Sequence, residues 1–266
     1  SYPNPEDPKA FELALKLAKE KDADIVLATD PDADRLGVYC KDTVNGGYIS
    51  FTGNMSGMLI AEYILRERTE NGTMPEKPAL VETIVTTDMA KAIAKAYGVH
   101  LIEVLTGFKF IGEQIKWFEE QNTYHYVFGL EESYGCLAGT YARDKDAVVA
   151  SMTLCEAAAY YKTQGKTLWD AMIDMYEKYG YYKDDVKAIT LKGIEGLEKI
   201  QTILETLRAD APKEIGGYKV LKVRDYKKDT ITDLADGKVT STGLPASNVL
   251  YYELEDDAWV CVRPSG

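Results

Sequence analysis

The stretch from residue 79 to residue 130, ALVETIVTTDMAKAIAKAYGVHLIEVLTGFKFIGEQIKWFEEQNTYHYVFGL, decides the fold. Three short apolar runs, at 79–85, 100–105 and 124–130, alternate with two longer segments of helical periodicity. Gly98 ends the first of these helices. A parallel pair of strands needs a crossover of this length, usually a helix. The stretch therefore predicts a mostly parallel sheet with helices on both faces.

The same alternation extends outward on both sides. Before the stretch we expect a helix at 8–24, a buried strand at 25–29 and a helix around 57–68, and after it helices at 145–164 and 167–179. After Gly180 the pattern changes. We expect a strand at 181–193, an amphipathic helix at 194–210, a strand at 216–226 and two further strand-like runs at 249–256 and 258–262. The fold class predicted is α/β, with a mixed, mostly parallel sheet, followed by a smaller α+β domain.

Composition narrows the classes of function. The chain has 266 residues, 45% of them hydrophobic and 28% charged, with a net charge of -12. Nucleic acid and anionic membrane would repel such a protein, so we expect neither as a partner. No run approaches the ~20 apolar residues of a membrane span, and residues 1–11 do not read as a signal peptide.

Cysteine and histidine are sparse. The four cysteines form no CxxC pair, which argues against a zinc knuckle and favours a reducing compartment, with the cytoplasm as the expectation. The two histidines, His100 and His125, lie in apolar segments and are expected to be packed strand residues. A catalytic triad or a multi-histidine metal site is therefore not expected.

Three aspartates at alternate positions, Asp30, Asp32 and Asp34, follow the strand at 25–29, and Arg35 comes next. Three carboxylates this close repel one another unless a cation or several donors lie among them. Hard oxygen ligands suit Mg²⁺. An EF-hand is excluded, because its glycine and glutamate positions are held by Arg35 and Lys41. The alternative is a solvated loop in which Asp30 caps a turn.

Two further loops follow predicted strands. Thr106 and Gly107 precede a helix whose free N–H groups could meet a phosphate or sugar oxygen, although an ordinary helix cap has the same pattern. Glu131, Glu132 and Ser133 follow a buried strand, and such side chains suit vicinal sugar hydroxyls. The alternative for this loop is a solvated acidic turn.

Two cationic segments could bind an anion. Arg143 and Lys145 lie at the start of a long helix, where cations oppose the helix dipole, although on local grounds an exposed charge run balanced by Asp144 and Asp146 explains them better. Arg263, Ser265 and Gly266 end the chain with the groups that a phosphate clamp uses.

Taken in order, these pieces resemble the α-D-phosphohexomutase superfamily, especially bacterial-type phosphoglucomutases and phosphomannomutases, over nearly the whole chain. The segments that carry the resemblance are YPNPEDP, TDPDADR, LTGFKFIG, GLEESYG, RDKDAV and RPSG. The wording of TGFKFIG and EESYG is similar to the glucose-preferring branch.

The resemblance implies a reaction in which an enzyme phosphoserine and a hexose monophosphate exchange phosphate through a 1,6-bisphosphate. For this sequence it implies glucose 1,6-bisphosphate as the activating intermediate and Mg²⁺ as the metal. It also implies roles for individual residues: metal ligands Asp30, Asp32 and Asp34; Arg35 beside the phosphoserine; sugar-site residues Thr106, Gly107, Glu131 and Ser133; a proton carrier, Lys145; and a phosphate clamp, Arg263, Ser265 and Gly266.

The resemblance also implies a division of the chain. Residues 1–43 would be the end of domain 2, residues 44–180 domain 3 and residues 181–266 a truncated domain 4. The family's Thr-Ala-Ser-His-Asn-Pro serine loop does not occur in these 266 residues. We therefore expect a fragment lacking domain 1, inactive by itself.

Three alternatives stay open. A phosphomannomutase differs only in the hydroxyl at C2, which none of these loops obviously reads. A phosphoglucosamine mutase fits less well, because the wording of the substrate loops differs. A non-catalytic module that binds sugar phosphate or metal would lack the serine loop altogether. The sequence does not indicate the oligomeric state.

Overall fold

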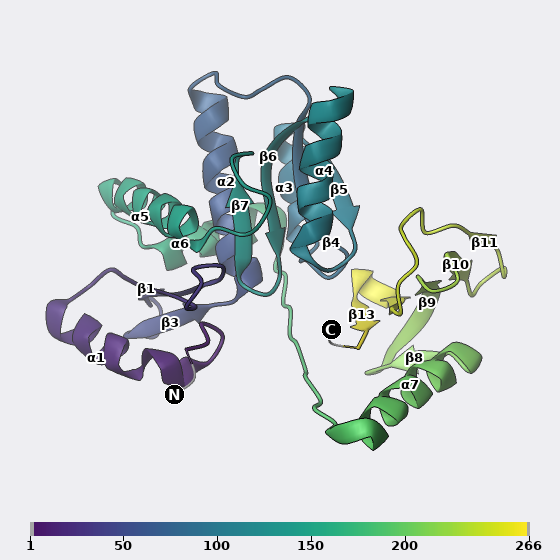
Figure 1. Cartoon of the computed structure of the whole chain (residues 1–266). Helices are drawn as coiled ribbons and strands as arrows, with labels where there is room; N and C mark the ends of the chain where they lie inside the picture. Colours follow the sequence, from purple (N-terminus) through teal and green to yellow (C-terminus); the bar gives the residue numbers. More distant parts are fainter. Residues whose placement is uncertain (1–2, 265–266) are drawn as a thin grey trace. The chain divides into compact units, whose positions relative to one another are not determined.

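The computed structural model describes residues 3–264, which form two compact units divided between Asp184 and Asp185 (Figure 1). We describe the two units separately. The first unit contains two sheets and most of the helices, and the second contains one sheet and one long helix.

The first unit starts with helical turns and a three-stranded antiparallel sheet of order β1-β2-β3. Its elements are η1 (Pro8–Phe11), α1 (Glu12–Lys21), β1 (Ile25–Thr29), β2 (Leu36–Lys41) and β3 (Tyr48–Phe51). The strand expected at 25–29 is present as β1, but the expectation that it is buried in a mostly parallel sheet is wrong. It is half-buried at the sheet edge and pairs antiparallel with β2. A short hairpin joins them, and no crossover helix intervenes.

The second sheet of this unit has the order β5-β4-β6-β7, in which β4 pairs parallel with β5 and β6, and β7 is antiparallel to β6. It confirms the predicted mixed sheet. Its strands and the helices around them are α2 (Gly53–Glu70), β4 (Pro78–Thr83), α3 (Met89–Tyr97), β5 (His100–Val104), α4 (Phe108–Gln121), β6 (His125–Glu131), β7 (Gly135–Ala138), α5 (Ala147–Thr163) and α6 (Leu168–Tyr179).

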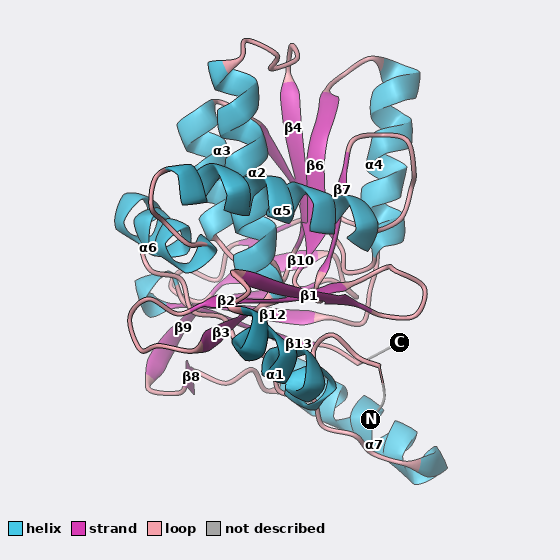
Figure 2. Ribbon diagram, turned by 90° about the vertical axis from the view of Figure 1, so that its left-hand side faces the viewer, coloured by secondary structure: helices cyan, strands magenta, loops and turns pink. Residues whose placement is uncertain are grey.

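Helices cover both faces of this sheet, as predicted. Figure 2 shows α2 and α3 on one side of β4 and β6, and α4 on the other. Leu80 and Phe128 point to the first side and pack with Met58 and Ile93, while Val81 points to the second. The alternation of side chains along a strand explains why residues 79–81 are apolar on both faces.

The second unit is an antiparallel sheet with one helix, which confirms the predicted α+β class. Its elements are α7 (Gly193–Ala209), β8 (Glu214–Ile215), β9 (Tyr218–Asp225), β10 (Thr230–Asp233), β11 (Val239–Thr240), β12 (Leu250–Leu254), η2 (Glu255–Asp257) and β13 (Trp259–Val262). Leu204 of α7 packs on Val220, Leu250 and Tyr252.

Two local expectations are wrong. Residues 181–192 were expected to include a strand, but they run extended with no strand assigned to them, so β-branched composition alone did not create a pairing. His100 and His125 each begin a strand but are exposed, because the first residue of a strand lies at the rim of the sheet. None of the helices described combines the length and apolar character that a membrane span requires.

Candidate active site

The candidate site lies where β4, β5 and β6 end. Because parallel strands end at one edge of a sheet, the loops that follow them meet there. Thr106 and Gly107 follow β5, and residues 131–135, which we call the glutamate hairpin, join β6 to β7. Residues 30–35, the aspartate hairpin, join β1 to β2 and reach the same place from the other sheet.

Backbone hydrogen bonds join the aspartate hairpin to its surroundings. Leu36 N donates to Tyr134 O at 2.9 Å, and Ala147 N donates to Ala33 O at 2.9 Å. The first bond links the two hairpins, and the second links the aspartate hairpin to the start of α5. The aspartate hairpin is therefore fixed to the turn after β6, through Tyr134, and to the first residue of α5, Ala147.

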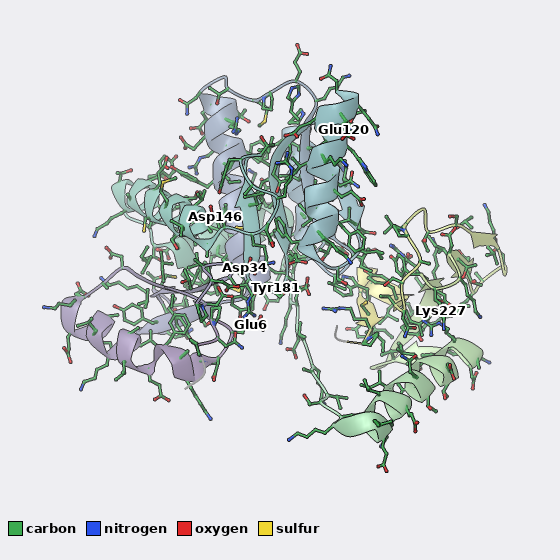
Figure 3. All side chains as sticks on the ribbon, viewed as in Figure 1. Glu6, Asp34, Glu120, Asp146, Tyr181 and Lys227 are labelled. Atoms are coloured by element: carbon green, nitrogen blue, oxygen red, sulfur yellow. The ribbon has the colours of Figure 1, made fainter. Side chains whose placement is uncertain are left out.

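Asp30 is the structural centre of the aspartate hairpin. Its buried carboxylate accepts hydrogen bonds from Asp34 N at 2.8 Å, Arg35 N at 3.0 Å and Arg35 Nε at 2.8 Å. Burial opposes ionisation, but the bonds from Arg35 outweigh it and hold the pKa of Asp30 below its ordinary value. Arg35 Nη1 also contacts Glu6 Oε1 at 3.0 Å, and Figure 3 labels Glu6 and Asp34 on this side of the unit.

Lys145 connects the two hairpins. Its Nζ lies 3.0 Å from Asp34 Oδ2, 3.0 Å from Asp144 Oδ1 and 4.0 Å from Glu131 Oε2. Its stem crosses Gly135, where a Cβ would collide with Lys145 Cδ. Burial disfavours its charge, but the bonds to Asp34 and Asp144 prevail and raise the pKa of Lys145. The amine is therefore protonated at neutral pH and can donate a proton or stabilise an anion.

Glu131 is the buried member of the glutamate hairpin. Its Oε1 accepts a hydrogen bond from Gly107 N at 2.8 Å. Burial raises the pKa of Glu131, and Lys145 and the Gly107 N–H partly offset this rise. Gly107 has a φ of 119° and ends the loop before α4. Because its N–H donates to Glu131, that N–H is not free for a ligand, which differs from the expectation for this loop.

The predicted site residues fall into two groups. The structure brings together Asp30, Asp34, Arg35, Gly107, Glu131 and Lys145, with Thr106 and Ser133 in the same loops. Asp32 lies exposed at the tip of its hairpin. Arg263 follows β13 in the second unit, and Ser265 and Gly266 lie outside the described residues.

The aspartate hairpin is the segment that would hold the Mg²⁺ implied by the resemblance. Within residues 3–264, no three His, Cys, Asp or Glu side chains converge as a ready metal site. The donor chemistry nevertheless fits, because hard carboxylate oxygens lie on one short hairpin. Each carboxylate offers about four acceptor positions on its two oxygens, and Asp30 uses three of them. Asp34 would have to exchange Lys145 for the ion.

Sequence reasoning missed Glu6, Thr83 and Thr86 as partners of the site, and it did not foresee that Glu132 contacts Thr83. Thr83 and Thr86 lie in an ordinary apolar strand and its following turn, with no local signal. Glu6 meets Arg35 across 29 positions of sequence. Such contacts depend on which segments the fold brings together, and no local pattern encodes them.

Comparisons with known proteins agree with this arrangement. Residues 1–46 match the model of phosphoglucomutase/phosphomannomutase alpha/beta/alpha domain II, and residues 52–179 match that of domain III. A Staphylococcus aureus phosphoglucomutase is 36% identical over 263 residues, covering 99% of this chain and 46% of the relative. A Staphylococcus epidermidis phosphoglucomutase is 37% identical, with 99% and 47% covered. The chain thus spans about half the length of these relatives.

Solved structures show the same fold. The Paramecium phosphoprotein pp63/parafusin, in its open form, superposes with a TM-score of 0.59 at 20% identity. The match covers 99% of this chain and 43% of the parafusin chain. A phosphoglucomutase/phosphomannomutase family protein of Burkholderia thailandensis has a TM-score of 0.55 at 17% identity, with 96% and 44% covered.

Proposed function

The chain belongs to the phosphoglucomutase/phosphomannomutase family, and on this premise we propose that the protein containing these residues interconverts glucose 1-phosphate and glucose 6-phosphate. The route is an enzyme phosphoserine and glucose 1,6-bisphosphate. One observation carries the proposal: Lys145 contacts Asp34 of the aspartate hairpin at 3.0 Å and approaches Glu131 of the glutamate hairpin at 4.0 Å. A single cation therefore stands between a candidate metal loop and a candidate sugar loop.

Each residue has a role that its surroundings support. Glu131, fixed by the Gly107 N–H, accepts hydrogen bonds from sugar hydroxyls together with Ser133 and Thr106. Lys145, held protonated by Asp34 and Asp144, donates a proton to the reacting oxygen or stabilises its charge. Arg35 faces the phosphoryl group. Mg²⁺ on Asp30, Asp32 and Asp34 would supply Lewis-acid stabilisation of the transferring phosphate when bound.

The division of the chain stays a proposal. Residues 1–43 form the end of domain 2, residues 44–180 domain 3, and residues 181–266 part of domain 4, with Arg263, Ser265 and Gly266 opening a phosphate clamp. A hexose phosphate is the proposed partner, and the cytoplasm the proposed location.

Turnover of glucose 1-phosphate by the longer protein, with Mg²⁺ and a trace of glucose 1,6-bisphosphate, tests the function. Asp32→Asn is expected to lower turnover and to raise the Mg²⁺ concentration needed for half-maximal turnover. Glu131→Ala is expected to raise KM for the sugar phosphate without changing that Mg²⁺ concentration. Unchanged kinetics in either variant would remove the role assigned to that residue. The 266 residues alone are expected to show no turnover, because they contain no Ser-His-Asn-Pro serine loop.

The second candidate function is a phosphomannomutase. Parallel kinetics with glucose 1-phosphate and mannose 1-phosphate decide between the two, and a preference for mannose would overturn the glucose assignment.

A further inference from the structure

Successive glutamates of the glutamate hairpin contact different strands of the sheet. Glu131 accepts from Gly107 N, after β5, whereas a carboxylate oxygen of Glu132 lies 3.3 Å from Thr83 Oγ1, at the end of β4. Glu131 ends β6 and Glu132 is the first residue of the turn that follows, so one hairpin contacts the ends of both strands.

The direction of each hydrogen bond around Glu132 follows from chemistry. An ionised carboxylate can only accept, so the Thr83 hydroxyl donates its single proton to Glu132. Thr86 Oγ1, 3.1 Å from Thr83 Oγ1, must then donate to Thr83. Thr86 Oγ1 in turn accepts from Thr83 N at 3.2 Å. The two threonines therefore close a ring whose only outward donation goes to Glu132.

This ring is buried. Thr83 is 1% exposed and Thr86 4% exposed, so water cannot readily replace a lost partner, and an unmade bond there is expensive. Thr83 is the last residue of β4, and β4 is the strand that pairs with both β5 and β6. The ring thus fastens the hairpin to the most firmly held strand of the sheet.

The backbone of the hairpin leaves it little freedom to move. Tyr134 has a φ of 68°, a left-handed conformation that a non-glycine residue adopts only when its surroundings require it. A Cβ at Gly53, the first residue of α2, would collide with Glu132 O and Tyr134 N. The hairpin therefore rests directly on helix backbone on one side and on the threonine ring on the other.

We propose that Thr83, Thr86 and Glu132 form a latch that positions Glu131 and Ser133 for the sugar, with Glu132 a positioning residue and no sugar ligand. The role in sugar binding rests on the proposed function, whereas the latch itself does not. Loss of the latch shifts the hairpin and weakens recognition of the sugar in both hexose phosphates, without changing the proposed metal ligands of the aspartate hairpin.

Hydrogen exchange on the 266-residue chain tests the latch without any activity. Gly107 N and Leu36 N both donate to the glutamate hairpin, so their exchange rates report its position. Thr83→Val keeps the shape of the side chain but removes the hydroxyl, and is expected to speed exchange at both amides about tenfold, the ratio that corresponds to the loss of one hydrogen bond. Thr83→Ser restores the hydroxyl and is expected to restore the rates.

Thr153→Val is the matched control, because it removes a buried hydroxyl bonded to Val149 O within α5. It should leave Gly107 and Leu36 unchanged. If Thr83→Val does not fold, Glu132→Ala at a partly exposed position removes the bond between the threonine ring and the hairpin and leaves the ring itself closed. Unchanged exchange at Gly107 and Leu36 in Glu132→Ala or in a folded Thr83→Val overturns the latch.

Kinetics of the longer protein test whether the latch affects binding of the sugar phosphate. Thr83→Val and Glu132→Ala are each expected to raise KM for glucose 1-phosphate and glucose 6-phosphate together by roughly tenfold, with the Mg²⁺ dependence unchanged. The double variant should be no worse than either single one, since both break one chain of bonds. A lowered melting temperature with unchanged KM would show a merely structural role. Faster exchange combined with no wild-type turnover would keep the latch and reject the proposed function.

Discussion

The aspartate hairpin and the glutamate hairpin are both tight, acidic connections between antiparallel strands, and each contains a non-glycine residue with positive φ, Ala33 at 56° and Tyr134 at 68°. They differ in what holds them. The side chains of the aspartate hairpin are held by the cations Arg35 and Lys145. The glutamate hairpin rests on helix backbone and buried hydroxyls.

The difference teaches how a fold separates two tasks. Carboxylates that are held by cations can exchange one cation for another, which a metal site needs. A loop held by close backbone contact keeps one shape, which recognition of a sugar needs. Four substitutions test whether this contrast is real.

The largest effect is expected from Gly53→Ala. Its methyl group would collide with Glu132 O and Tyr134 N, which are backbone atoms and cannot rotate away. We expect a loss of about 3 kcal/mol in the free energy of unfolding, measured by urea denaturation. Gly57→Ala, one turn later, would meet only the Cδ1 methyl of Leu130, which can move. If both variants lose the same stability, backbone contact does not fix the glutamate hairpin.

Lys145→Met is expected to come second. It removes the cation from Asp34 and Asp144, whose contacts are both 3.0 Å, at a cost of about 2 kcal/mol. The freed Asp34 should then bind Mg²⁺ more tightly, which isothermal titration calorimetry on the 266-residue chain measures. Lys162→Met, which breaks an exposed pair with Asp24, is the control and should change neither quantity much. Weaker Mg²⁺ binding in Lys145→Met would contradict the exchange of cations.

Glu82→Gln addresses the strand that supports the glutamate hairpin. Burial raises the pKa of Glu82 well above 4.5, helped by Glu103 and Asp88 and opposed by Lys91. The native state therefore holds a proton that the unfolded chain releases, so stability falls as pH rises above about 4.5. Glutamine does not titrate. We expect the variant to match the wild type near pH 4 and to become progressively more stable than it towards pH 8. A constant difference across this range would show that Glu82 titrates normally.

The smallest effect is expected from Glu6→Gln. Glu6 pairs with Arg35 at 3.0 Å, but both side chains are partly exposed, so the loss should stay below about 1 kcal/mol and shrink in high salt. Glu119→Gln, which loses a comparable exposed pair with Arg143, provides the comparison. A loss several times larger in Glu6→Gln would mean that the aspartate hairpin depends on its N-terminal neighbour as firmly as the glutamate hairpin depends on Gly53.

The sequence predicted the parts whose signals are local. The helices from Gly53 to Tyr179 and the strands β4, β5 and β6 follow from periodicity and glycine stops, and they give the sheet edge where the loops meet. The antiparallel setting of β1 was missed, because five apolar residues look alike in a parallel and in an edge strand. The strand expected within 181–192 failed, since a strand needs a partner as well as suitable residues.

The candidate site divides in the same way. Asp30, Glu131 and Lys145 carry recognisable motifs and could be named from sequence, whereas the contact between Lys145 and Asp34 could not, because it joins residues more than a hundred positions apart. Thr83 and Thr86 carry no motif at all. Their part depends on where the end of β4 and the turn after it lie, and on what packs there.

The bonds that join Ala33 to Ala147 and Leu36 to Tyr134 have a consequence for the order of folding. Each closes a long loop of chain, and the entropy of that closure is overcome only once the helices and strands between have formed. The aspartate hairpin should therefore be among the last parts of the first unit to order, after β4, β5 and β6 are paired. Its carboxylates would then come together only when Lys145 is already in place beside Asp34.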